Sequence, residues 1–366
     1  MRLLNTYQKN NLILEKRKKI LVAPLNSGLG HATRCIPIIE ALDNHGFEPI
    51  IASDGAALLL LKKEFPQYTA LELPAYELEY AKGESVFNLA HIMRMGRMFA
   101  NITRERKAVK VWVLEMGIDG IISDSRPGAY YNGLPNVFIT HRLNILYGNT
   151  AAVSGTLHRN FIRKFKECWV PDVNQSPNLS GKLGHTEDTI NGLRYIGTMS
   201  RLHKTGTDKQ YDLAVLLNGD EAANKQLEAR LREDLLHFNG NVIFIRGVVE
   251  QKQTIIRHGH ITYYNFMESD MLEEVLNKSS LVLCRPGYST IMDVSKLCKK
   301  VFFIPAPGNE EHLYLAKKLK KAGLAPYASQ KSFRIKDLEK AGMYKGLRDI
   351  NGLEKWKNLF CLFEGK

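Results

Sequence analysis

The sequence predicts an α/β protein with two parallel-sheet domains. Short apolar runs alternate with amphipathic segments, glycine-rich loops follow several of these runs, and the pattern starts again near residue 211. The 366 residues are more than one hydrophobic core usually organises. We expect a first domain over residues 1–199, a second domain over 210–345, and a C-terminal helix within 346–366 that packs back toward the first domain.

The first domain opens with a strand, a loop and a helix. Residues 19–24 (KILVAP) have the apolar run of a buried strand, and residues 25–31 (LNSGLGH) form a glycine loop. Residues 32–42 then place apolar side chains at helical spacing. The same alternation predicts further strands at 47–53, 120–123 and 136–140.

The second domain repeats this beginning. Residues 211–217 (YDLAVLL) are predicted to form a strand, and residues 222–236 an amphipathic helix. The segment 200–209 before them is polar and poor in apolar residues, as expected of an interdomain linker. Four more short strands are predicted at 242–245, 261–264, 280–284 and 301–304.

Composition and charge exclude several classes of function. The longest apolar stretch, residues 56–61, is far shorter than the ~20 residues of a membrane-spanning helix, so we expect a cytoplasmic chain. Five scattered cysteines without a CxxC pair predict neither a disulfide framework nor a zinc site. The net charge of +13 favours anionic lipid or phosphorylated molecules as partners. Nucleic acid is not expected, because aromatic residues do not interleave with Lys and Arg.

The first candidate site is the glycine loop before the first helix. Gly28 and Gly30 allow the backbone to pass close to a ligand, and the helix N-terminus offers unpaired N–H groups. With Thr33 and Asp54, the loop also approximates a dinucleotide fingerprint, which suggests an NAD(P)-dependent oxidoreductase as an alternative. His31 is a candidate base near neutral pH. The simpler interpretation is a tight turn with a polar cap.

The second candidate site follows the strand at 280–284. Arg285 and Gly287 form a turn, and Ser289 and Thr290 begin the next helix. Backbone amides, two hydroxyls and the positive helix end suit a phosphate or diphosphate. Asp293 lies one turn further along the same face, where its carboxylate can accept hydrogen bonds from a ribose diol. The simpler interpretation is that Ser289 caps the helix and Asp293 is a solvated acid.

The third candidate site lies at the start of a later helix. A strand and a Pro/Gly loop lead to Asn309, which is expected to cap the helix, with Glu311 and His312 in its first turn. A carboxylate and an imidazole facing a cleft are suited to recognising hydroxyl groups. The macrodipole alone also favours acids at this position.

These motifs together resemble the C-terminal half of glycosyltransferase family 28, of the GT-B class. The family pattern is R-x-G-x-x-T-x-x-E, then a strand that ends in proline, then an E-Q-x-x-N-A stretch. Here Asp293 replaces the glutamate that ends the first motif, His312 replaces the glutamine and Leu315 replaces the asparagine. The remaining matches are Arg285, Gly287, Thr290, Pro305, Glu311 and Ala316, with SGLGH and Tyr195-Ile196-Gly197 in the first half.

The resemblance implies two Rossmann-like parallel-sheet domains that face a central cleft. It also implies an inverting, metal-independent enzyme that moves a sugar from a UDP-sugar co-substrate to an acceptor hydroxyl, with no other cofactor and His31 as the catalytic base. The sequence has no DxD motif. A non-catalytic nucleotide-sugar-binding protein is the alternative that the substituted positions suggest. The implied donor-binding residues are Gly219, Phe266, Met267, Met271, Arg285, Gly287, Ser289, Thr290, Asp293, Glu311 and His312.

The acceptor is expected to bind on the first domain. Asp124, Arg126 and His141 follow predicted strands, so their side chains should face the same cleft as Gly28 and Gly30. The ordinary polarity of loops that follow strands explains Asp124, Arg126 and His141 equally well. The segment 91–113 has an apolar face beside a basic stripe, which suggests peripheral contact with an anionic membrane and a lipid-linked acceptor. The apolar residues are Ile92, Met95, Phe99 and Ile102, and the basic ones are Arg94, Arg97, Arg104 and Lys107.

Overall fold

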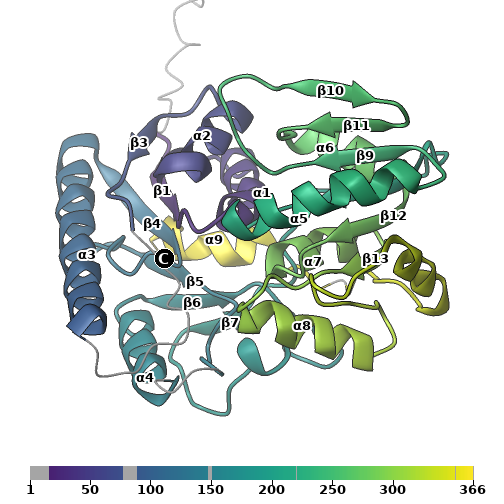
Figure 1. The fold of residues 1–366 in the computed structure, drawn as a ribbon. Helices are drawn as coiled ribbons and strands as arrows, with labels where there is room; N and C mark the ends of the chain where they lie inside the picture. Colours follow the sequence, from purple (N-terminus) through teal and green to yellow (C-terminus); the bar gives the residue numbers. More distant parts are fainter. Residues whose placement is uncertain (1–15, 77–88, 147–150, 220, 351, 366) are drawn as a thin grey trace, which may run out of the picture.

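The computed structural model describes residues 16–76, 89–146, 151–219, 221–350 and 352–365. Two α/β domains lie side by side, each built on a central sheet (Figure 1). This arrangement confirms the predicted fold class. In the described part of the chain, no helix is both long and apolar enough to cross a bilayer.

The N-terminal sheet is entirely parallel, because every strand pair in it runs in one direction. Its short strands β3, β6 and β7 were not predicted, because each contains a charged residue, Glu72, Glu167 or Arg194, that shortens its apolar run. Four helices connect the strands: α1 (Gly30–Asn44), α2 (Gly55–Glu64), α3 (Leu89–Met116) and α4 (Ala151–Ile162). The strand order is β3 (Ala70–Glu72), β2 (Glu48–Ser53), β1 (Lys19–Pro24), β4 (Ile118–Asp124), β5 (Asn136–Ile139), β6 (Glu167–Val170) and β7 (Leu193–Tyr195).

The C-terminal sheet is parallel except for one antiparallel hairpin, β10–β11. Strand β10 was not predicted, because all four of its residues are exposed and it lacks a buried face. The helices are α5 (Glu221–Asp234), α6 (Ser269–Asn277), α7 (Tyr288–Lys296) and α8 (Glu310–Lys321). The strand order is β10 (Ile255–His258), β11 (Ile261–Tyr264), β9 (Val242–Ile245), β8 (Tyr211–Leu216), β12 (Ser279–Cys284) and β13 (Lys300–Phe303).

The last helix, α9 (Trp356–Glu364), packs on the N-terminal domain (Figure 1). Phe360 makes edge-to-face contact with Phe47, with ring centroids 5.7 Å apart. Phe363 lies against Gly120 of β4, so closely that a Cβ on that glycine would meet its ring at 2.4 Å. The Lys18 ammonium donates to the carbonyl of Phe363 (3.0 Å) at the C-terminal end of the helix.

Each sheet changes winding direction where a candidate site lies. In the N-terminal sheet the chain moves outward from β1 to one side and from β4 to the other, and in the C-terminal sheet β8 and β12 have the same relationship. Ligands of open α/β sheets bind outside the carboxyl ends of the strands at such points. The glycine loop after β1 and the turn after β12 both occupy these positions, and α1 and α7 pack against each other between the sheets.

Candidate active site between the two domains

The glycine loop of the N-terminal domain touches the start of α7. The Ser289 hydroxyl donates to the carbonyl of Gly30 over 2.7 Å. A Cβ on Gly28 would lie 3.1 Å from the Cα of Gly219, and Gly28 itself has φ +73°, a conformation that favours glycine. The structure therefore brings together four predicted site residues that are far apart in sequence.

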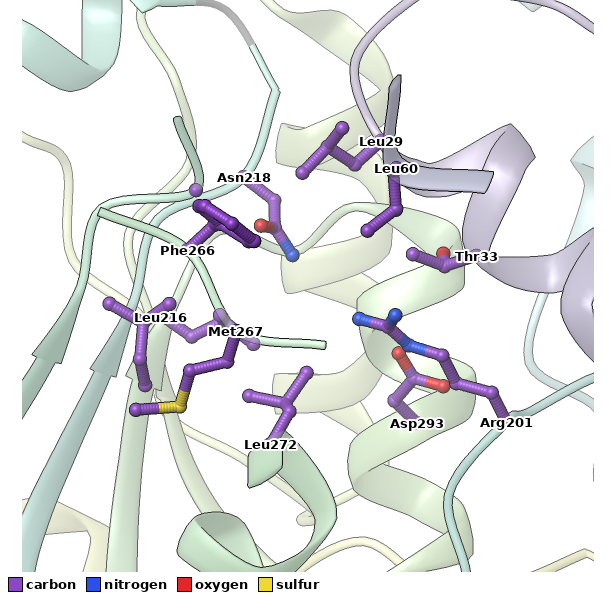
Figure 2. Close-up of a pocket in the computed structure, with 12 residues that line it drawn as sticks. Leu29, Thr33, Leu60, Arg201, Leu216, Asn218, Phe266, Met267, Leu272 and Asp293 are labelled. Carbon is purple, nitrogen blue, oxygen red and sulfur yellow. The ribbon is translucent and has the colours of Figure 1, made fainter. Parts of the chain in front are cut away.

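Between the domains lies a small pocket (Figure 2). The N-terminal domain contributes apolar side chains and Thr33 to it, the C-terminal domain contributes the loops after β8, β9 and β11 and the helix α7, and the linker contributes Arg201. Phe266, Met267 and Asp293 were predicted as donor-binding residues and line it. The full lining is Leu29, Thr33, Leu60, Arg201, Leu216, Asn218, Ile245, Gly247, Phe266, Met267, Leu272 and Asp293.

Asp293 and Arg201 form the charged wall of this pocket (Figure 2). Burial raises the pKa of Asp293 to about 6, with Arg201 and the Ser200 hydroxyl opposing the shift. The Arg201 side chain is only 6% exposed and binds Glu64 (2.9 Å), while its Nε is buried without a hydrogen-bond partner. Sequence reasoning missed Arg201, because it lies in a segment interpreted only as a polar linker.

His31 faces a buried carboxylate. Its Nδ1 lies 2.8 Å from Asp124, which is fully buried, and the His31 side chain is 16% exposed. Arg34 holds both oxygens of the same carboxylate. Burial and Arg34 lower the pKa of His31, and Asp124 partly offsets them. Burial disfavours the charged form of Asp124, yet Arg34 and His31 hold the pKa of Asp124 well below its ordinary value.

His141 lies at the contact between the domains. Its Nε2 is 3.0 Å from Oε1 of Glu311, which belongs to α8 of the C-terminal domain. Arg142 pairs with the other oxygen of Glu311. The His141 ring stacks on Tyr288, with centroids 4.5 Å apart and planes 5° apart. Glu311, expected at the donor sugar, is thus engaged by the N-terminal domain in this structure.

Two predicted arginines do not face the pocket. Arg285 was expected at a diphosphate, but its side chain is buried within the C-terminal domain. Its guanidinium donates to the carbonyl of Ile304 (3.1 Å) and to the side chains of Asn224 and Gln330. It therefore secures the loops behind the turn. An arginine at the end of a strand is long enough to point either toward the pocket or into its own domain, and the sequence alone does not decide which.

Arg126, expected at the acceptor, is likewise buried in the N-terminal domain. It pairs with Asp54 (2.6 Å) and with Glu105, and donates to the carbonyl of Pro74. Asp54 is the acid that a dinucleotide's ribose would need, and its pairing with Arg126 removes it from that role. This buried network argues against the oxidoreductase alternative.

The remaining donor-side residues surround the start of α7. Thr290 lies near Asn218 (3.4 Å), and His312 lies beside Gly287. The backbone N–H of Ala306 donates to Nδ1 of His312, which leaves the proton on Nε2. Burial lowers the pKa of His312 to about 4, so the ring is neutral at pH 7.

Met271 lies on the outer side of this group, partly exposed, with its sulfur 3.4 Å from the Gln253 amide. Gln253 also donates to the carbonyl of Phe266. Among the described residues, no three His, Cys, Asp or Glu side chains are grouped as a metal site.

Comparisons with known proteins agree with this geometry. Residues 215–350 match the glycosyltransferase family 28 C-terminal domain. A relative from Haemophilus ducreyi (strain 35000HP / ATCC 700724) is 22% identical over 333 residues, which are 88% of each chain. It is the UDP-N-acetylglucosamine--N-acetylmuramyl-(pentapeptide) pyrophosphoryl-undecaprenol N-acetylglucosamine transferase.

Solved structures share the fold. Acinetobacter baumannii MurG superposes with a TM-score of 0.54 at 16% identity, over 95% of this chain and 100% of that one. A putative UDP-N-acetylglucosamine 2-epimerase from Listeria monocytogenes gives 0.61 at 11% identity, over 96% and 98%. Because an epimerase and transferases share this architecture, the fold alone does not define the reaction.

The two-sheet architecture and the intervening cleft define a protein of the GT-B class. Within that class, residues 215–350 of this chain carry the glycosyltransferase family 28 C-terminal domain, and this match supports a glycosyltransferase. The resemblance that Arg285, Gly287, Thr290 and Asp293 suggested is confirmed, and the oxidoreductase alternative is not favoured.

The contact at Gly28 gives a test of how the domains meet. We expect Gly28→Ala to hold the domains apart, because its Cβ would press on the backbone of Gly219 at 3.1 Å. Gly46→Ala is the matched control, since Gly46 has a similar φ of +83° and no heavy atom within 4 Å of an added Cβ. Both variants should lose ~1–2 kcal/mol of stability from backbone strain. Thermal unfolding should show a lower melting temperature for Gly28→Ala than for Gly46→Ala, because only Gly28→Ala also strains the contact between the domains, and equal values for both variants would contradict this.

Proposed function

We propose that this chain is an inverting, metal-independent glycosyltransferase that moves a sugar from a UDP-sugar to an acceptor hydroxyl. The observation that carries the proposal is the meeting, across one cleft, of the His31–Asp124 pair with the pocket that holds Asp293. The family 28 domain and the Haemophilus ducreyi relative support a UDP-sugar donor.

The donor occupies the C-terminal side of the cleft. Phe266 and Met267 lie beside the base, and the Asp293 carboxylate accepts hydrogen bonds from the ribose. Ser289, Thr290 and the N-terminal amides of α7 face the diphosphate. As the bond to the sugar breaks, negative charge grows on the leaving UDP, and these donors and the helix dipole stabilise it.

Two neighbouring side chains divide the remaining donor-side roles. Because Glu311 is paired across the domain boundary, we assign recognition of the sugar hydroxyls to His312. Its Nε2–H is a hydrogen-bond donor beside Gly287. Met271 lies at the outer side of the diphosphate position.

The acceptor occupies the N-terminal side. Nδ1 of His31 lies 2.8 Å from Oδ1 of Asp124 and 2.8 Å from the Arg34 guanidinium. In the proposed step the neutral ring carries its proton on Nδ1, donates it to Asp124 and presents the Nε2 lone pair to an acceptor hydroxyl. The hydroxyl proton passes to Nε2 while its oxygen bonds to the anomeric carbon and UDP departs from the opposite face, which inverts that carbon. The buried Asp124 carboxylate then stabilises the imidazolium.

Replacing His31 tests the catalytic step. We expect His31→Ala to lower kcat by ~10²–10⁴ with little change in UDP affinity, because a positioned base acts mainly on the transition state. Burial and Arg34 lower the pKa of His31, so the wild-type rate should fall only at a pH below that at which an ordinary histidine takes up a proton. His258→Ala, an exposed histidine on β10, is the control. Tight UDP-sugar binding without turnover on any acceptor would favour the non-catalytic alternative instead.

Replacing Asp293 tests the nucleotide site. UDP should raise the melting temperature of the wild type, and NADH should leave it unchanged. Asp293→Asn should weaken UDP binding by ~10- to 100-fold, since the ribose loses a charged acceptor. Because burial raises the pKa of Asp293 to about 6, wild-type affinity should fall as the pH drops below that value. Titration calorimetry between pH 5 and 8 measures both effects.

Asp293→Asn should have the opposite effect on the stability of the ligand-free protein from its effect on UDP binding. The folded-state pKa of Asp293, about 6, lies above its ordinary 3.8, so the stability of the ligand-free protein should fall as the pH rises from 3.8 to about 6 and stay reduced above that. Asp293→Asn should therefore stabilise the ligand-free protein by roughly 3 kcal/mol at pH 7–8. A variant that loses both stability and UDP affinity would contradict this explanation.

We also propose a peripheral contact between α3 and an anionic membrane, which suits a lipid-linked acceptor and a chain at the cell envelope. Arg97, Arg104 and Lys107 are exposed on this helix, beside exposed Phe99 and Leu114. Basic side chains next to apolar ones are typical of helices that rest on anionic lipid. Ile102, expected on the same apolar face, is instead buried in the domain. The side chains of Ile92, Arg94 and Met95 lie outside the described residues.

Vesicle binding tests this contact. Arg104→Glu with Lys107→Glu should reduce binding to phosphatidylglycerol vesicles at least ~10-fold, since each basic residue near such a surface contributes ~1 kcal/mol. Lys317→Glu with Lys321→Glu on α8 changes the charge equally and is the control. Equal loss in both double variants would show a non-specific charge effect, and no loss in the α3 variant would contradict the contact.

A further inference from the structure

A chain of buried polar contacts connects the catalytic histidine to the opposite domain. Arg34 of α1 is buried and holds both oxygens of Asp124, the partner of His31, and its guanidinium also lies 2.8 Å from Nδ1 of His31 itself. Its NH1 lies 3.0 Å from Nδ1 of His141. The other nitrogen of that ring, Nε2, lies 3.0 Å from Oε1 of Glu311. The four contacts therefore link His31 to the first turn of α8.

The chemistry of these groups determines the direction of each hydrogen bond. A guanidinium only donates, so Nδ1 of His141 accepts from Arg34 and the ring proton lies on Nε2. That proton is donated to the Glu311 carboxylate. Burial lowers the pKa of His141 to about 4, which keeps the ring in this neutral form at pH 7. His141 thus needs one partner from each domain.

Both cross-domain contacts of His141 depend on the closed cleft. Arg34, Asp124 and His141 belong to the N-terminal domain, whereas Glu311 and the stacked Tyr288 belong to the C-terminal domain. If the domains separate, the Nε2 proton loses its acceptor and the ring loses its stacking partner. His141 stays in the N-terminal domain with Arg34, but its ring is then no longer fixed as the acceptor for the Arg34 guanidinium.

We propose that His141 is a positioning residue that makes the alignment of the His31–Asp124 pair depend on closure of the two domains. This inference rests on the proposed glycosyltransferase function and deepens it. Glu311 orients His141, His141 holds Arg34, and Arg34 holds the carboxylate that orients His31. The base is aligned only when the donor-binding domain has closed over the acceptor side, which protects the donor from water in the open state.

The charges around His31 act in the same direction. In the closed structure Arg34 and Arg142 are balanced by Asp124 and Glu311, and the neighbouring Cys35 thiol stays neutral because burial raises its pKa. Burial, Arg34 and Arg142 lower the pKa of His31, whereas its hydrogen bond and charge pairing with Asp124 raise it. A His31 ring that loses its alignment with Asp124 while it stays buried should therefore bind a proton less tightly.

Two substitutions separate the hydrogen bonds of His141 from its stacking. His141→Phe keeps an aromatic ring against Tyr288 but removes both hydrogen bonds. His141→Gln supplies one acceptor and one donor but no ring. We expect His141→Phe to lower kcat ~10- to 100-fold while UDP affinity changes less than ~2-fold, and His141→Gln to restore kcat to within ~3-fold of the wild type. UDP binding by both variants shows that each is folded.

Histidine-labelled NMR provides a readout that a purely structural role would not change. The His31 signal, assigned by its loss in His31→Ala, should titrate at a lower pH in His141→Phe than in the wild type, and His141→Gln should restore the wild-type titration. Wild-type kcat in His141→Phe, or equal impairment in both variants, would overturn the proposal. So would a higher KM for the acceptor at unchanged kcat, which would indicate direct acceptor binding. If the wild type transfers no sugar at all, the proposed function fails, while the His31 titration still decides whether His141 is coupled to it.

Discussion

The architecture depends on the close approach of two loops, one from each sheet. Each loop lies at the point where the strand order of its sheet reverses direction. The hydroxyl of Ser289 reaches the backbone of Gly30, and Gly28 passes the backbone of Gly219 with no room for a side chain. This contact places the N-terminus of α7 opposite that of α1. Both helix ends carry unpaired N–H groups and partial positive charge, so the cleft favours an oxygen-rich, anionic ligand before any particular side chain is considered.

Around this contact the protein buries charges that would be unfavourable if unpaired. Arg34, Arg126 and Arg285 are each almost fully buried, and each is surrounded by carboxylates or carbonyl oxygens. Only Arg34 connects to the proposed catalytic base. Asp293 differs from Asp124, because its burial is not fully compensated and its pKa rises. The nearby orphaned Nε of Arg201 is a second sign that this pocket is completed by a ligand.

Much of the fold follows from local pattern. The strands predicted at 19–24, 242–245 and 261–264 have the same bounds in the structure, and the other predicted strands agree within one or two residues at each end, because buried parallel strands are continuous apolar runs. The missed strands β3, β6, β7 and β10 are short or exposed, so their sequences lack the apolar pattern of a buried strand. In the site, the turn that contains Gly287, Thr290 and Asp293 was recognisable, because these residues lie at fixed intervals along one contiguous segment. Arg201 and the pairing of His31 with Asp124 were not, since they join distant segments without a common motif.

The sequence by itself determined the two-domain α/β architecture, the loops that open toward the cleft and the family of the C-terminal half. Each of these depends on a pattern within contiguous residues. Tertiary structure alone decided which polar residues face the ligand. Asp124 and Arg126 are two positions apart on one strand end, yet one meets His31 and the other is sealed against Asp54 and Glu105. That difference is set by the charges that other segments bring into reach, and a buried ionised group is held by the partner that the folded chain supplies.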